Sequence, residues 1–74
     1  MNKQEFLSEL QEIMMLEEAL SEDSELDALE AYDSMTHLTL LSLFEEEFGK
    51  ELEAQDLIDA KIVNDLLVLA GLGD

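Results

Sequence analysis

A hydroxyl and an imidazole lie three positions apart in the middle of the chain, at Ser34 and His37. On a helix, this spacing places both side chains on one turn, and a serine beside a histidine is the simplest nucleophile–base pair. However, His37 is the only histidine, cysteine is absent, and no motif supplies an oxyanion hole or a substrate pocket. The residues therefore argue against a hydrolase and against a metal site made of histidine and cysteine ligands.

Ser34 also has a simpler explanation as the beginning of a helix. Asp33 and Ser34 are both good N-cap residues, because their side-chain oxygens can accept hydrogen bonds from the unpaired N–H groups of a first turn. These local rules leave open whether Ser34 is only a cap or is also a point of chemical attachment.

Alternating carboxylates at Asp23, Glu25 and Asp27 resemble the start of a calcium-binding loop. An EF-hand would need glycine where Ala28 stands and a bidentate glutamate where Ser34 stands. Because both defining positions differ, the pattern predicts weak binding of divalent cations at most.

A second acidic group, Glu45-Glu46-Glu47, falls near the end of a predicted helix. Two neighbouring carboxylates could act as general acid and base, but negative charge near a helix C-terminus is unfavourable for the helix dipole. Two explanations stay open for this group: a solvated surface, or a surface kept for a basic partner.

The overall charge restricts the class of partner. Twenty acidic residues against three lysines give a net charge of −17 in 74 residues. This charge argues against binding to nucleic acid or to anionic membrane, and favours partners with basic surfaces. No apolar run is long enough to span a membrane, and the acidic amphipathic start does not resemble a signal peptide, so we expect a cytoplasmic protein.

Hydrophobic spacing predicts four helices in one domain of residues 1–74. The first spans about residues 3–18, and a long loop of residues 19–33 follows, with Leu26 and Leu29 as anchors on the core. The second helix spans 34–48 and stops at Gly49, a good residue to end a helix. A short third helix is predicted over 54–59, and a last helix without an obvious cap over 62–70, ending at Gly71.

The second helix is predicted to have two distinct faces. Its core face is expected to contain apolar side chains, with Leu38, Leu41, Phe44 and Phe48 at its centre and Leu40 and Leu43 at its sides. A separate stripe at spacings of i, i+4, i+7 and i+11 contains Met35, Thr39, Ser42 and Glu46. Because this stripe is otherwise polar, we expect Met35 to be exposed beside Ser34.

These residues resemble a known family. Asp33-Ser34-Met35, the leucines that follow, and Leu43-Phe44-Glu45-Glu46-Glu47-Phe48-Gly49 look like the second helix of acyl carrier proteins, and the resemblance covers the whole chain. Ala31 stands where many members have glycine, and Met35 replaces the commoner leucine. Tyr32 before the aspartate is typical of discrete, specialised carriers outside housekeeping fatty acid synthesis.

The resemblance implies an all-α fold, a small four-helix bundle of acyl-carrier type with three longer helices, a short third helix and a long loop between helices 1 and 2. It implies that Ser34 receives a 4′-phosphopantetheine arm from coenzyme A through a phosphopantetheinyl transferase. Acyl or related carboxyl intermediates of fatty acid, polyketide or nonribosomal peptide biosynthesis would then be held as thioesters on this arm. Such a carrier is not an enzyme, and its missing cysteine fits a thiol that is imported.

The same resemblance implies a docking surface for acyl-loading and acyl-processing enzymes with basic surfaces. Its residues would be Asp33, Met35, Thr39, Ser42, Glu45 and Glu46. It also implies that acyl chains lie around the second helix, where Leu38, Leu41 and Phe44 could line a pocket, although core packing is a sufficient explanation for them. We expect a monomer. The alternative function is an acidic helical adaptor or inhibitor that binds a basic protein surface without a prosthetic group.

Overall fold

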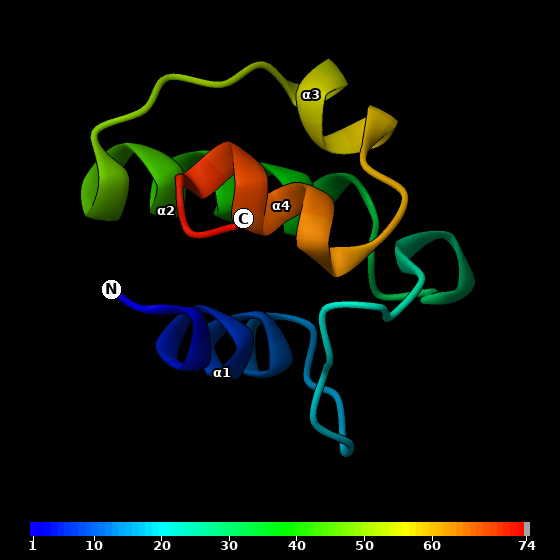
Figure 1. Cartoon of the computed structure of the whole chain (residues 1–74). Helices are drawn as coiled ribbons and strands as arrows, with labels where there is room; N and C mark the ends of the chain where they lie inside the picture. The colour runs from blue at the N-terminus through cyan, green and yellow to red at the C-terminus, as the bar shows by residue number, and fades with distance from the viewer. Residues whose placement is uncertain (74) are drawn as a thin grey trace.

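The computed structural model describes residues 1–73 and is built from helices (Figure 1). The elements in chain order are α1 (Lys3–Ile13), a short 3-10 helix η1 (Leu26–Ala28), α2 (Ser34–Phe48), α3 (Ala54–Asp59) and α4 (Val63–Ala70). The described part of the chain contains no strand, and only one isolated bridge pairs Glu25 with Ile62. The predicted all-α fold with four helices, the third of them short, is confirmed.

The three longer helices form the body of the fold. α1 runs opposite to α2, and α3, which contacts α2, covers one end of the bundle (Figure 1). The radius of gyration is 10.9 Å, close to the roughly 11 Å expected for a compact domain of this length. Within residues 1–73, no helix has the length and apolar character needed to cross a membrane.

The core is one cluster to which every helix contributes. α1 supplies Phe6 and Leu10, α2 supplies Leu40 and Phe44, and the remaining fully buried side chains are Leu26, Leu57, Val63, Leu66 and Leu67. The rings of Phe6 and Phe44 meet edge to face with their centroids 5.8 Å apart, a favoured arrangement for aromatic pairs. This contact fixes the packing of α1 against α2, the helix that begins at Ser34.

The first helix ends five residues earlier than predicted, at Ile13 rather than Glu18. Met15 adopts a left-handed conformation with φ of 55°, and the N–H of Leu16 donates to the carbonyl of Gln11 at 3.0 Å. This turn ends the helix and lets Leu16 pack against the core. The prediction was wrong because glycine normally occupies such a position, and methionine gives no local signal for it.

Backbone hydrogen bonds hold the long loop against the beginning of α4. The N–H of Leu26 donates to the carbonyl of Lys61 at 2.9 Å, and the N–H of Val63 donates to the carbonyl of Ser24 at 3.0 Å. Leu26 is fully buried and Leu29 is half-buried, so the prediction that both anchor the loop on the core is confirmed.

The last helix does have a cap, although the residues before it gave no sign of one. One carboxylate oxygen of Asp65 accepts the N–H groups of Lys61 and Ile62 at 2.8 and 3.1 Å. These two backbone hydrogen bonds lower the pKa of Asp65 below its ordinary value. The helix begins at Val63, one residue later than predicted, and ends before Gly71, which has a left-handed φ of 81°.

Candidate functional site: the beginning of α2 and its exposed face

Asp33, not Ser34, caps α2. The backbone of Asp33 is extended, and its carboxylate accepts the N–H of Thr36 at 3.0 Å. Ser34 is consequently the first helical residue, with an exposed side chain. Within the described chain, the Ser34 hydroxyl takes part in no hydrogen bond. Of the two possible caps, Asp33 is therefore the one that caps the helix, and the Ser34 hydroxyl remains without a hydrogen bond at the beginning of the helix.

The turn before Ser34 is held in place by three contacts. The Thr36 hydroxyl donates to the carbonyl of Ala31 at 2.6 Å from a buried position. The Tyr32 hydroxyl donates to the carbonyl of Leu57 in α3. The Tyr32 ring also meets His37 edge to face, with ring centroids 4.5 Å apart. Together these contacts fix the backbone on both sides of Ser34.

Burial and two nearby carboxylates perturb the Tyr32 phenol. Its pKa is raised to about 12, chiefly because burial disfavours the charged phenolate and secondarily because Asp27 and Asp65 repel it. The phenol therefore stays neutral and keeps its hydrogen bond to Leu57 over the whole physiological range of pH.

His37 does not pair with Ser34. Its imidazole packs on Tyr32, and its Nε2 atom is buried without a hydrogen-bond partner in the described chain. No hydrogen bond joins the Ser34 hydroxyl to the imidazole in the part of the chain that the structure describes. The structure thus gives His37 a packing role beside Tyr32 and leaves Ser34 without a general base of its own.

The positive end of the α2 dipole favours an anion at Ser34, against the negative charge of the Asp33 carboxylate that caps the same end. A helix as long as α2, with 15 residues, carries a partial positive charge at its N-terminus, where the first N–H groups have no intrahelical partners. A phosphodiester on the Ser34 oxygen would place its negative charge at this end of the dipole. An exposed, unbonded hydroxyl at this position therefore fits a phosphate-linked group.

The six predicted docking residues all lie on the exposed side of α2, at its N-cap or along its length: Asp33, Met35, Thr39, Ser42, Glu45 and Glu46. Met35 is 76% exposed, which confirms its predicted position. No basic residue lies in the last turn of α2, so nothing on the helix itself neutralises Glu45 and Glu46 there.

Leu38 belongs to this exposed face, contrary to the prediction that it lies in the core. Its side chain is 64% exposed. The buried row of α2 is instead Thr36, Leu40 and Phe44, at spacings of four residues. At 100° per residue, Leu38 lies about 160° around the helix from Leu40. The error arose because leucine was assigned to the core by residue type, and because buried Thr36 was missed as the first member of the row.

The outer face of α2 therefore combines two kinds of group. Met35 and Leu38 form an exposed apolar pair one turn apart beside Ser34, and Glu45 and Glu46 follow two turns further along. We call Met35, Leu38, Ser42, Glu45 and Glu46 the α2 outer face. Leu38 could have been found from the sequence, because it lies on the same side as Met35 and Ser42 in the helical projection.

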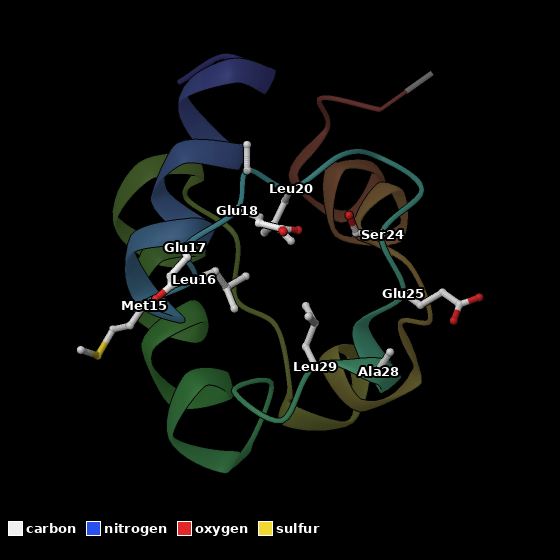
Figure 2. A pocket seen from close by; sticks show the side chains of 10 residues that line it. Met15, Leu16, Glu17, Glu18, Leu20, Ser24, Glu25, Ala28 and Leu29 are labelled. Carbon is white, nitrogen blue, oxygen red and sulfur yellow. The ribbon is translucent and has the colours of Figure 1, made fainter.

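The three residues predicted to line an acyl pocket around α2 lie partly in the core and partly on the surface. Phe44 is fully buried in the core and Leu41 is half-buried against it, whereas Leu38 is exposed. A hollow of about 630 Å³ does exist, but it lies between the end of α1 and η1, and no residue of α2 lines it (Figure 2).

Residues 1–73 contain no cluster of three or more histidine, cysteine or acidic side chains arranged to hold a metal ion. No family model matches the chain, and neither a curated protein nor a solved structure matches it.

Proposed function

We propose that this protein is a carrier that presents acyl or related carboxyl intermediates on a 4′-phosphopantetheine arm attached to Ser34. The observation that carries the proposal is that Asp33 and Ser34 have different roles at the beginning of α2. Asp33 makes the capping hydrogen bond, and Ser34 offers an exposed, unbonded hydroxyl at the positive end of the helix.

Attachment requires only that Ser34 act as an acceptor. Its oxygen would displace 3′,5′-ADP from the pantetheine phosphate of coenzyme A, while the transferase supplies Mg²⁺ and the base that takes the hydroxyl proton. That external base is needed because His37 packs on Tyr32 and does not reach Ser34 through a hydrogen bond. When bound, the arm supplies the thiol that a chain without cysteine lacks.

The fixed turn around Ser34 supports this role. Thr36, Tyr32 and His37 hold the segment to the body of the protein, so a partner enzyme would meet Ser34 in a defined position. Holding the reacting group in place lowers the entropic cost of each encounter.

The α2 outer face is the proposed docking surface. Exposed Met35 and Leu38 offer apolar contact beside Ser34, and Glu45 and Glu46 offer charge to a basic partner. A carrier must release each partner after one reaction, and exposed ion pairs worth about 0.2–1 kcal/mol each suit such transient binding. The net charge of −17 would steer basic enzymes toward the carrier.

The test is an intact mass measured after incubation with coenzyme A, Mg²⁺ and a broad-specificity phosphopantetheinyl transferase. The wild-type protein should gain one phosphopantetheine, and Ser34→Ala should gain none. Ser8→Ala is the matched control, because it removes an exposed hydroxyl from α1, outside the α2 outer face, and should be modified like the wild type. If the wild type gains no mass while a known carrier in the same tube is modified, the carrier proposal is refuted and the alternative of an acidic adaptor is favoured.

A further inference from the structure

The hollow between the end of α1 and η1 has the size of a small-molecule site. Its volume is about 630 Å³, and its lining comes from residues 15–20, 24–25 and 28–29. Ligand sites in proteins usually span about 300–1,000 Å³. The hollow lies outside α2, α3 and α4, and is therefore separate from the α2 outer face.

Three leucine side chains make the apolar wall of this hollow. Leu16, Leu20 and Leu29 converge on it from different parts of the loop (Figure 2). All three are only half-buried, so each keeps apolar surface in contact with water. A ligand with an aliphatic chain would remove that surface from water, at about 25 cal/mol for each Å² buried.

The charge around the hollow determines which polar group a ligand should carry at the end of its aliphatic chain. The Glu18 carboxylate lies beside Leu20 over the hollow, whereas Glu17 and Glu25 point away from it (Figure 2). No lysine, arginine or histidine is among the lining residues. An anionic head group would therefore meet only negative charge here, while an ammonium group would find a carboxylate partner.

The hollow lies within reach of Ser34. Leu29 precedes Ser34 by five residues, so their backbones can be separated by at most about 18 Å. The N–H of Tyr32 donates to the carbonyl of Leu29 at 3.1 Å, and this turn shortens the separation further. A phosphopantetheine arm has about as many bonds between the serine oxygen and its sulfur as five residues of backbone. Such a tether would raise the local concentration of its cargo to the millimolar range.

We propose that this hollow shelters the free end of a cargo that combines an aliphatic chain with a terminal amine. The aliphatic part would pack on Leu16, Leu20 and Leu29, and the ammonium group would pair with Glu18. The part of the inference that concerns a tethered cargo rests on the proposed carrier function. The binding preference of the hollow does not.

The first experiment uses free probes and needs no modification of Ser34. N-methyl-8-aminooctanamide and its uncharged isostere N-methylnonanamide are titrated into the ¹⁵N-labelled protein, and amide chemical shifts are followed. The amine should shift the amides of residues 16–29 more strongly than the isostere does. Glu18→Gln should weaken amine binding about two- to fivefold, as expected for the loss of an exposed ion pair.

Glu47→Gln is the matched control, because it removes one exposed charge from outside the hollow. Amine binding that falls equally in both variants would show only the effect of net charge and would overturn the inference. Equal shifts from the two probes, or shifts centred on α2 and α3, would also overturn it.

The second experiment tests the tethered form. The two chains are attached to Ser34 through hydrolysis-stable amide linkages to the phosphopantetheine arm. Hydrogen exchange is then followed at the same backbone N–H groups of the protein as in the first experiment. The amine-bearing arm should protect residues 16–29 from hydrogen exchange more strongly than the isosteric arm does, because both arms share the aliphatic chain and only the amine can pair with Glu18. Failure to attach either arm would contradict the carrier function, while successful attachment without protection would contradict the assignment of the hollow.

Discussion

Ionisation of Tyr32 gives a direct measure of how firmly the turn before Ser34 is held. In the native state its pKa is raised to about 12 from the ordinary 10.0 of tyrosine. The neutral phenol is the form that the native state favours. Its contribution to the free energy of unfolding is therefore fully present below pH 10 and is lost as the pH rises through about 12.

The size of this contribution follows from the shift. Two pKa units correspond to about 2.7 kcal/mol, and exposure of part of the ring to solvent reduces the expected contribution to about 1–1.5 kcal/mol. Urea unfolding followed by circular dichroism between pH 9 and 11.5 should show stability falling across this interval. Tyr32→Phe is the control, because it keeps the ring packed on His37 and leaves the three lysines to titrate as in the wild type. The wild-type curve should fall more steeply than the curve of this variant.

Absorbance near 295 nm provides an independent readout. Tyr32 is the only tyrosine and tryptophan is absent, so the phenolate signal belongs to one residue. In the native protein the midpoint should lie well above the midpoint in strong urea. Coincident midpoints near pH 10 would refute the burial of Tyr32 and its hydrogen bond to Leu57.

Three further predictions concern other parts of the chain. Asp65→Ala should lower the free energy of unfolding by about 1 kcal/mol at neutral pH, because alanine has no oxygen to accept the N–H groups of Lys61 and Ile62. Because the pKa of Asp65 is lowered in the native state, the wild-type advantage over this variant should be present above about pH 4 and vanish in acid, as urea titrations can show. Gly73→Ala should lower stability by about 1–3 kcal/mol, because an added Cβ would lie 2.7 Å from a methyl group and 2.9 Å from the backbone nitrogen of Val68; an unchanged thermal midpoint would contradict this packing. Glu45→Lys with Glu46→Lys should slow modification by the transferase in a salt-dependent manner while leaving helicity intact, and a wild-type rate would show that docking occurs elsewhere.

Much of the fold followed from local patterns. The bounds of α2 were predicted correctly, because Asp33, one of the two predicted caps, and Gly49 mark its two ends. The carbonyls of Glu45 and Phe44 accept the N–H groups of Gly49 and Lys50, in the manner typical of a helix that ends at glycine.

The features that were missed depend on long-range contacts. The end of α1 depends on the left-handed backbone conformation of Met15. The conformation of the long loop depends on backbone hydrogen bonds to residues 61–63, which lie more than 30 positions away in the sequence. Neither arrangement has a local sequence signal. The hollow was missed for the same reason, since its walls come from Leu16, Leu20 and Leu29, which meet only after the loop has folded.

The candidate site was predicted in part. The position of Ser34 at the beginning of α2 and the exposed position of Met35 followed from capping rules and helical spacing. Leu38 was assigned to the wrong face because hydrophobicity outweighed the helical projection. The role of Thr36 was missed because a threonine inside an apolar pattern gives no sign that its hydroxyl bonds a carbonyl before the helix.

The central claim is that Ser34 carries the prosthetic group, and peptide-level mass spectrometry of the modified wild-type protein tests it most directly. Fragments should assign one phosphopantetheine to Ser34 and none to the neighbouring hydroxyls of Thr36, Thr39 and Ser42. Assignment of the group to another residue would contradict the claim, and so would an unmodified chain beside a fully modified control carrier.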